Sequence, residues 1–257
     1  MISFVKYQGT GNDFILIDDR SLSFDSKLVA PLCHRKFGIG ADGVILLQPT
    51  EIADFRMRIF NRDGTEAESC GNGLRCLGRF ITDLGFSEKI YSIATHDRVV
   101  QLSYHSDQIR VSMGKAKDLR LHIPTEYGPV HFVDTGVPHA VFFVADVHSA
   151  PLDQLGPFFR RHPTFGPLGA NVNLASPQPD GSIHVRTFER GVEGETLACG
   201  TGACAVATVI QKLYPHQNSN PMKLFFPGGV LEISIDQEQL FMVGPAKKVF
   251  SGLFSEI

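Results

Sequence analysis

The chain of 257 residues carries 24 Lys and Arg against 27 Asp and Glu, a formal net charge of −3. This near-balance excludes the strongly basic surface of a nucleic-acid or anionic-membrane binder, and 43% hydrophobic with 20% charged residues is typical of a globular protein. No apolar run approaches the ~18 residues that span a membrane. The opening segment 1–6 favours a strand over a signal peptide. With five cysteines and no export signal, we expect a reducing, cytoplasmic compartment.

The predicted elements combine alternating or β-branched strands with helices of 3.6-residue spacing. In chain order they are a helix at 27–36, a strand at 44–47, a helix at 74–84, strands at 99–102, 109–113 and 183–188, a helix at 203–213, and strands at 230–235 and 247–254. The helices at 74–84 and 203–213 are apolar nearly all round, which indicates that they are buried. We therefore predict an α+β fold with each sheet rolled around a central helix.

The chain contains an internal repeat. Cys-Gly-x-Gly occurs at 70–73 and again 129 residues later at 199–202. Three further groups recur in the same order at nearly the same offset. Thr10-Gly11 matches Thr135-Gly136, and residues 40–42 match 169–171. The set Arg58, Phe60 and Arg62 matches the set Arg186, Phe188 and Arg190. We predict two pseudo-symmetric halves, 1–114 and 115–247, with the C-terminal strand 248–257 returning to the first half. The alternative is one unrepeated domain.

Two glycine-rich segments do not predict a nucleotide site. Residues 38–43 satisfy G-x-G-x-x-G, but a dinucleotide site needs a strand before and a helix after this motif, and here the order is reversed. Residues 9–13 lack the Gly-Lys-Ser/Thr ending of a P-loop. No cysteine or histidine spacing indicates zinc, since Cys33 and His34 are adjacent. We expect neither a metal nor a cofactor.

Each Cys-Gly-x-Gly segment comes just ahead of a predicted helix. The N–H groups of a first helical turn bind anions, so they lower the pKa of a thiol from ~8.5 towards neutrality and can also hold a substrate carboxylate. Many cysteines are merely small buried hydrophobes, and we assign that role to Cys33, Cys76 and Cys204. For Cys70 and Cys199, which recur in matching turns, we favour catalysis.

Two such thiols suit one reaction class. If their helices point at each other across an interdomain cleft, they hold one carboxylate and place a thiol on each face of its α-carbon. A thiolate then removes the α-proton while the opposite thiol returns a proton to the other face. The N–H donors stabilise the charge that develops on the carboxylate. The sequence therefore predicts a two-base racemase or epimerase with its active site in the interdomain cleft.

Longer segments around both cysteines resemble the diaminopimelate epimerase family. Residues 61–76 (NRDGTEAESCGNGLRC) look like its first active-site signature and residues 188–203 (FERGVEGETLACGTGA) like its second, and residues 7–14 and 38–43 also fit. The resemblance implies a pyridoxal-phosphate-independent isomerase, commonly a homodimer. Such an enzyme converts LL- to meso-diaminopimelate for lysine and peptidoglycan precursor synthesis.

The same resemblance implies roles for individual residues. Cys70 and Cys199 match the catalytic cysteines, and His139 and Glu189 match the polar groups that assist them. The backbone donors to the reacting carboxylate are Gly71, Asn72, Gly200 and Thr201. The substrate-binding residues are Asn12, Asn61, Asn171, Glu189 and Arg190, of which Asn61, Asn171 and Arg190 hold the distal amino-acid end. The alternatives are turn formation for Asn12 and Asn61, a structural hydrogen bond for His139 and a surface charge for Arg190.

One position departs from the family pattern. Many members have Gly-Asn-Pro-His where this chain has Gly136-Val137-Pro138-His139. The replaced Asn binds the distal end of the substrate, and valine cannot hydrogen-bond. We therefore expect relaxed specificity, including slow racemisation of a shorter acidic amino acid such as glutamate.

Three other functions remain open from the sequence. A proline-racemase-like enzyme shares the two-cysteine fold, although the Glu189-Arg190 pair and Asn61 imply a substrate with a second charged end. A redox protein would form a disulfide between Cys70 and Cys199. A non-catalytic binding protein would bind the ligand without exchanging its α-proton.

Overall fold

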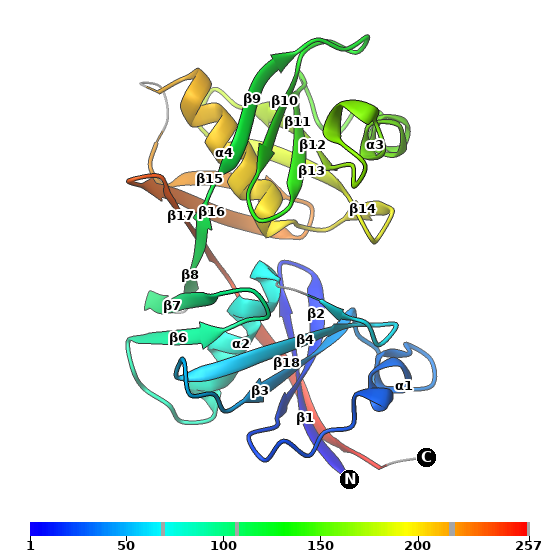
Figure 1. The fold of residues 1–257 in the computed structure, drawn as a ribbon, viewed down its shortest axis with the longest axis vertical. Helices are drawn as coiled ribbons and strands as arrows, with labels where there is room; N and C mark the ends of the chain where they lie inside the picture. Colours follow the sequence, from blue (N-terminus) through cyan, green and yellow to red (C-terminus); the bar gives the residue numbers. More distant parts are fainter. Residues whose placement is uncertain (68–69, 106–107, 216–218, 256–257) are drawn as a thin grey trace. The chain divides into compact units, whose positions relative to one another are not determined.

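The computed structural model describes residues 1–67, 70–105, 108–215 and 219–255. The chain divides into two compact units, of which unit 1 comprises Met1–Val111 with Gly244–Ile257 and unit 2 comprises Ser112–Val243. Each unit combines antiparallel and parallel strand pairs with a few helices (Figure 1), so the predicted α+β class is confirmed. Residues 256 and 257 of the predicted C-terminal strand lie outside the described residues.

Unit 1 is a sheet around one long helix. Its helices are a 3₁₀ turn at Ser26–Leu28, α1 (Val29–Cys33) and α2 (Gly71–Asp83). Its strands are β1 (Ile2–Gly9), β2 (Asn12–Asp18), β3 (Gly43–Gln48), β4 (Phe55–Asn61), β5 (Glu66–Ala67), β6 (Ile90–Ala94), β7 (Val99–His105), β8 (Gln108–Lys115), which runs on into the first residues of unit 2, and β18 (Lys247–Phe254). The helix α2 packs against β1, β2, β3, β4, β7 and β18, and is therefore central (Figure 1).

Unit 2 repeats this plan. Its helices are α3 (Leu152–Arg160), a 3₁₀ turn at Pro163–Phe165 and α4 (Gly200–Leu213). Its strands are β9 (Lys117–Ile123), β10 (Val130–Asp134), β11 (Pro138–Phe143), β12 (Asn171–Pro177), β13 (Ile183–Glu189), β14 (Gly194–Thr196), β15 (Met222–Phe226), β16 (Gly229–Asp236) and β17 (Gln239–Gly244). Here α4 is the central helix, since it packs against β10, β11, β12 and β16.

The two units share one strand order. In unit 1 neighbouring strands pair as β18-β1-β2-β3-β4-β6-β7-β8, and in unit 2 as β9-β10-β11-β12-β13-β15-β16-β17. The parallel pairs are also equivalent, namely β2/β3 and β4/β6 in unit 1 and β11/β12 and β13/β15 in unit 2. The ion pair Arg58–Glu66 even recurs as Arg186–Glu195. The internal repeat in the sequence therefore corresponds to a repeated fold.

Strand register corrects one detail of the repeat. Gly43 and Asn171 are the first residues of β3 and β12, and they lie opposite Phe14 and His139 of the equivalent neighbouring strands. The offset in these strands is thus 128 residues, and the expected match of Asp42 with Asn171 is wrong. A shift of one residue would turn every side chain to the other face of the sheet, so Asp42 is an additional residue before β3.

Two short helices differ from the sequence prediction. The predicted helix 27–36 is a 3₁₀ turn followed by α1, which ends at Cys33 because the next residue turns the chain. The His34 Nδ1 accepts hydrogen bonds from the backbone N–H groups of Lys36 and Phe37. The helix α3 was not predicted from the sequence, since Pro157 lies inside it and proline normally interrupts helices.

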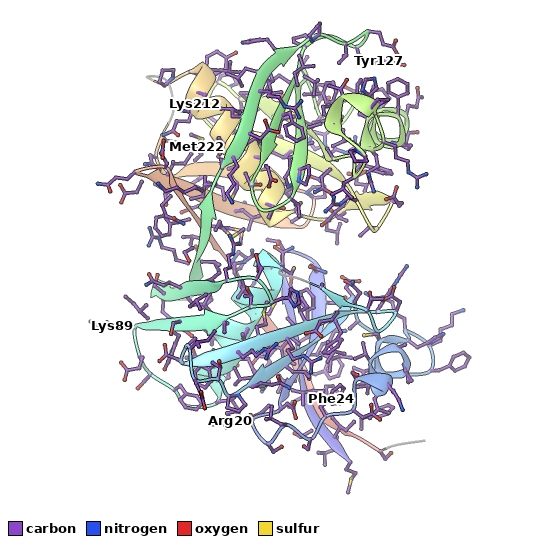
Figure 2. All side chains as sticks on the ribbon, viewed as in Figure 1. Arg20, Phe24, Lys89, Tyr127, Lys212 and Met222 are labelled. Atoms are coloured by element: carbon purple, nitrogen blue, oxygen red, sulfur yellow. The ribbon has the colours of Figure 1, made fainter. Side chains whose placement is uncertain are left out.

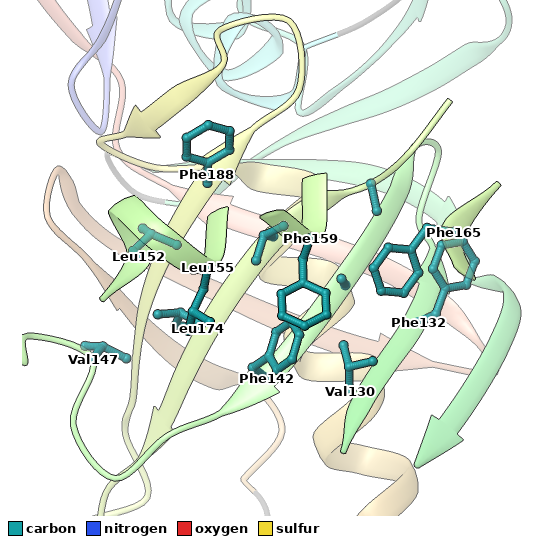
Figure 3. Packing of buried hydrophobic residues seen from close by; sticks show 13 residues of the cluster. Val130, Phe132, Phe142, Val147, Leu152, Leu155, Phe159, Phe165, Leu174 and Phe188 are labelled. Carbon is teal, nitrogen blue, oxygen red and sulfur yellow. The ribbon is translucent and has the colours of Figure 1, made fainter. Parts of the chain in front are cut away.

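The helix α3 covers an apolar cluster on the unit 2 sheet. Its Leu152, Leu155 and Phe159 pack with residues of β10–β13, including Phe142 and Leu174 (Figure 3). Exposed polar side chains, such as those of Arg20, Lys89 and Lys212, lie on the surfaces of the units (Figure 2). In the described part of the chain, no helix combines the length and apolar character needed to cross a bilayer.

Candidate active site

Cys70 lies at the N-terminus of α2 and caps it. Its backbone is extended (φ −146°, ψ 117°), and its Sγ accepts a hydrogen bond from the backbone N–H of Gly73 at 3.4 Å. The first N–H groups of a helix have no partner within the helix, and together with the helix dipole they favour negative charge. This position therefore favours the thiolate form of a cysteine.

Cys199 caps α4 in the same way. Its backbone is also extended (φ −121°, ψ 114°), and the N–H of Gly202 lies 3.4 Å from its Sγ. The predicted carboxylate donors are the first two residues of the two helices, Gly71 and Asn72 in α2 and Gly200 and Thr201 in α4. Each unit thus carries one thiol beside the first backbone N–H groups of its central helix.

Asn12 and Asn72 lie next to Cys70 in unit 1. The Asn12 Oδ1 is 3.7 Å from the Cys70 Sγ and 3.4 Å from the Asn72 Nδ2. The Asn12 Nδ2 donates to the Asp42 Oδ2 at 2.8 Å. Because a carboxylate only accepts, Asp42 fixes the amide with its oxygen facing the thiol. Asp42 was not among the predicted site residues, although an acidic residue between a Gly-Ala pair and a buried strand was a usable signal.

An ion-pair network supports this side of the site. The carboxylate of Asp13, next to Asn12, lies 2.7 Å from the Lys6 Nζ and 2.7 Å from an Arg35 nitrogen, and Lys6 also donates to the Gly40 carbonyl. Burial raises the pKa of the Asp13 carboxyl, but the hydrogen bonds from Arg35 and Lys6 outweigh it and lower the pKa to about 2.

We expect this network to make unit 1 sensitive to acid. A carboxyl whose pKa falls from 3.8 to about 2 on folding stabilises the folded state above pH 4, by about 2 kcal/mol, and loses that contribution as the pH falls to 2. Urea unfolding of the natural protein and of Asp13→Asn measures it. The difference in unfolding free energy should be largest near pH 7 and shrink towards pH 2, and a difference independent of pH would contradict the prediction.

Glu189 and Thr201 lie next to Cys199 in unit 2. The Cys199 Sγ lies 3.9 Å from the Glu189 Oε1, to which its S–H can donate, and 3.5 Å from the Thr201 Oγ1. Thr135 donates its hydroxyl to the Thr201 carbonyl at 2.8 Å and so ties this turn to the end of β10. Glu189, the last residue of β13, is thus placed to accept a hydrogen bond from the Cys199 thiol.

His139, Asn171 and Arg190 also come together in unit 2. The Asn171 Oδ1 accepts from the backbone N–H of Arg190 at 2.7 Å, and its Nδ2 donates to the Pro138 carbonyl at 3.4 Å. Asn171 thus joins the segments that carry His139 and Arg190. Burial lowers the pKa of His139 to about 3, and the positive charge of Arg190 acts in the same direction. The imidazole is therefore neutral at physiological pH.

Asn61 has a different setting from the other predicted site residues. It is exposed at the end of β4, and its Nδ2 donates to the Thr65 Oγ1 at 3.0 Å within a turn. This contact agrees with the turn-forming alternative, which is compatible with substrate binding. The repeat makes Asn61 the counterpart of Glu189, because each is the last residue of its strand.

Arg75 is a buried cation that was not among the predicted site residues. It lies in α2, its Nη2 donates to the Thr10 Oγ1 at 2.9 Å and its Nε to the Pro245 carbonyl at 3.3 Å. Burial lowers its pKa to about 10, while the thiols of Cys76 and Cys70 act in the opposite direction. Its charge therefore favours a thiolate at Cys70. The available signal was an arginine between Leu74 and Cys76 in a predicted helix with apolar spacing.

No group of three His, Cys, Asp or Glu side chains that could hold a metal ion occurs within residues 1–67, 70–105, 108–215 and 219–255.

Two solved structures with this fold share little sequence with the chain. A PhzF-family phenazine biosynthesis protein from Bacillus anthracis aligns with a TM-score of 0.75 and 16% identity over 98% of this chain and 99% of that one. A probable proline racemase from Agrobacterium radiobacter aligns with a TM-score of 0.74 and 16% identity over 99% and 93%. At this identity the likeness shows the fold alone.

Other proteins share much more of their sequence with this chain. The family model described as diaminopimelate epimerase matches residues 4–119 and 131–249. A diaminopimelate epimerase from Methanothrix thermoacetophila is 42% identical, with 99% of this chain and 96% of the relative covered, and one from Synechocystis sp. is 41% identical, with 98% of each covered. With a family match along most of its length and relatives this similar over their whole length, the chain belongs to the diaminopimelate epimerase family and is an isomerase.

Proposed function

We propose that the protein converts LL-diaminopimelate to meso-diaminopimelate by two-base proton transfer, without a cofactor. The observation that carries this proposal is the matched pair of thiols, Cys70 and Cys199, each hydrogen-bonded at 3.4 Å to the first turn of a central helix. Membership of the family supplies the substrate class. We further propose a cytoplasmic homodimer that serves lysine and peptidoglycan precursor synthesis.

In the proposed reaction one sulfur accepts the α-proton as the other donates one. A thiolate takes the proton from one face of the α-carbon, and the electron pair shifts towards the carboxylate. The opposite thiol then protonates the other face, so that the thiol and thiolate exchange roles. The N–H groups of Gly71, Asn72, Gly200 and Thr201 stabilise the developing negative charge, and His139 and Glu189 assist the two thiols.

The distal end of the substrate would be held by Asn61, Asn171 and Arg190. A guanidinium binds a carboxylate through two parallel hydrogen bonds, and amide oxygens accept from an ammonium group. The Asn171 Oδ1 already accepts from the Arg190 backbone, so Asn171 also fixes the position of that arginine. Asn12 and Glu189 would bind near the reacting end, since both lie next to a thiol.

Solvent-deuterium exchange tests the proposal. The enzyme is incubated with LL-diaminopimelate in D₂O, and mass spectrometry and chiral chromatography follow deuterium at the α-carbon and the formation of the meso isomer. We expect one deuterium per inversion. A protein that binds the substrate but incorporates no deuterium would be a binding protein, and the proposal would fall.

Val137 predicts a broader substrate range. It is half-buried in the turn between β10 and β11, and its carbonyl accepts from the Thr135 backbone N–H at 3.2 Å. Its side chain offers no hydrogen bond to the distal end of the substrate, so discrimination against glutamate should weaken. The kcat/KM values for diaminopimelate and glutamate measure this, with Val137→Asn as the comparison. No glutamate turnover at high enzyme concentration would refute the prediction.

The other candidate functions have less support. Proline racemases share the fold, but the relatives that align at about 40% identity are diaminopimelate epimerases. The pair Glu189-Arg190 also suits a substrate with two charged ends. A redox role predicts loss of activity on oxidation that a reductant reverses, and this can accompany epimerisation as a side reaction.

A further inference from the structure

Three buried polar side chains lie together in unit 2. His139, Asn173 and Thr187 are each 0% exposed. Asn173 and Thr187 lie opposite one another in β12 and β13. A Cβ added to Gly202 in the first turn of α4 would lie 2.5 Å from the Asn173 Oδ1. The trio therefore lies against the start of the helix that Cys199 caps.

The equivalent positions in unit 1 are apolar. Ile45 and Ile59 form the corresponding opposed pair in β3 and β4, and Phe14 of β2 is the counterpart of His139. All three are buried. The same fold is thus built with an apolar trio at these positions. Polar side chains cost stability in a core unless they are hydrogen-bonded, so the polar trio of unit 2 indicates a function rather than a requirement of the fold.

Hydrogen bonds fix the orientation of Asn173. Its Nδ2 lies 3.1 Å from the Ala140 carbonyl oxygen and 3.1 Å from the His139 Nδ1, and its Oδ1 accepts from the Thr187 hydroxyl at 2.9 Å. A carbonyl only accepts, so the amide NH₂ must face Ala140. Its second N–H then points to the His139 Nδ1, which must act as an acceptor.

The single proton of the neutral imidazole is therefore on Nε2. This nitrogen is buried and has no hydrogen-bond partner among the described residues. A buried donor without an acceptor destabilises the folded protein. An anionic group that arrives during turnover, such as a thiolate or a carboxylate, would satisfy it.

We propose that Asn173, oriented by Thr187, is a positioning residue that keeps the proton of His139 on Nε2, so that His139 serves epimerisation as a hydrogen-bond donor. The effect on turnover rests on the proposed function, whereas the tautomer does not. In serine-protease triads, holding an imidazole in the wrong tautomer costs about 10⁴ in kcat. A loss of the same kind is expected here.

Nitrogen NMR of the natural protein is the first test. Long-range ¹H–¹⁵N spectra of protein with ¹⁵N-labelled histidine distinguish a protonated from an unprotonated ring nitrogen, and the His139→Gln spectrum identifies the signals of His139 among the ten histidines. We expect a protonated Nε2 and an unprotonated Nδ1 at pH 7. The opposite pattern overturns the proposal, whatever the activity of the protein.

Substitution of Asn173 is the second test. Asn173→Asp keeps the shape but cannot donate, so the proton should move to Nδ1 and kcat should fall by about 10²-fold or more, with a smaller change in KM. Thr187→Val and Thr187→Ser form a matched pair, because only serine keeps the hydroxyl. Thr187→Ser should retain the natural tautomer and most of kcat, and Thr187→Val should lower kcat.

The outcomes separate the two proposals. An Asn173→Asp protein that keeps the natural tautomer, or that loses it without a change in kcat, refutes the positioning role. If Asn173→Asp does not fold, the natural spectrum and the Thr187 pair still decide, and equal kcat values for Thr187→Val and Thr187→Ser then count against it. A natural protein with the expected tautomer but no epimerase activity refutes the proposed function and leaves the assignment of the proton intact.

Discussion

Replacement of Cys70 or Cys199 by alanine is expected to lower the rate of epimerisation by on the order of 10⁴-fold, at the upper end of what a positioned acid or base contributes. Each inversion needs a base on one face of the α-carbon and an acid on the other. With one sulfur missing, no group returns the proton to the opposite face. The measurement is kcat for the conversion of LL- to meso-diaminopimelate.

Two cysteines in the same helices provide matched controls. Cys76 of α2 and Cys204 of α4 are 0% exposed, and burial raises the pKa of Cys76 to about 12. Alanine at either position should cost some stability through a small cavity but leave kcat within about twofold. Loss of activity in Cys76→Ala equal to that in Cys70→Ala would show that folding, and not proton transfer, explains the result.

Proton exchange without inversion can survive in the single variants. In Cys199→Ala the remaining sulfur of Cys70 can still remove a proton from one stereoisomer and return a solvent-derived one to the same face. We therefore expect deuterium incorporation with retained configuration from the stereoisomer that presents its proton to the remaining sulfur. Complete loss of exchange with both stereoisomers in both variants would argue against independent roles for the two thiols.

The repeat made much of the fold predictable from sequence. Matching Cys-Gly-x-Gly turns predicted two equivalent helix starts, and the alternating segments predicted strands around them. The helix α3 was not predicted because Pro157 interrupts its helical sequence pattern. Its formation depends on packing over Phe142 and Leu174. The offset of 128 in β3 and β12 needed strand register, because single-residue insertions in loops leave no sequence signal.

The site was predictable where chemistry follows from residue type at a helix start, as at Cys70 and Cys199. It was not predictable where function depends on which strand lies beside which. Asn173 is one polar residue in the buried strand β12, and its meaning appears only when Thr187 and His139 are found as its neighbours. The roles of Asp42 and Arg75 were not predicted for the same reason, since their partners Asn12 and Thr10 are distant in sequence.

Gly202→Ala should be far more damaging than the same change at Gly73, although each glycine takes the same place after its cysteine. A Cβ at Gly202 would lie 2.5 Å from the Asn173 Oδ1 and 3.3 Å from the Cys199 Sγ. The Asn173 amide cannot retreat, because Thr187, Ala140 and His139 hold it. We expect a loss of about 1–3 kcal/mol in unfolding free energy from overpacking and of about 10²-fold or more in kcat, since both the thiol and the imidazole must move.

At Gly73 the nearest atoms are the terminal methyl carbons of Ile45 and Ile59, at 3.0 and 3.2 Å. These can rotate away, and alanine is intrinsically better in a helix than glycine by up to about 1 kcal/mol. The two effects nearly cancel, so Gly73→Ala should change stability by less than about 1 kcal/mol. Urea unfolding and steady-state kinetics of the two variants measure the contrast. Equal losses of unfolding free energy and of kcat in the two variants would contradict the prediction. They would show that the buried polar trio of unit 2 is no more rigid than the apolar trio of unit 1.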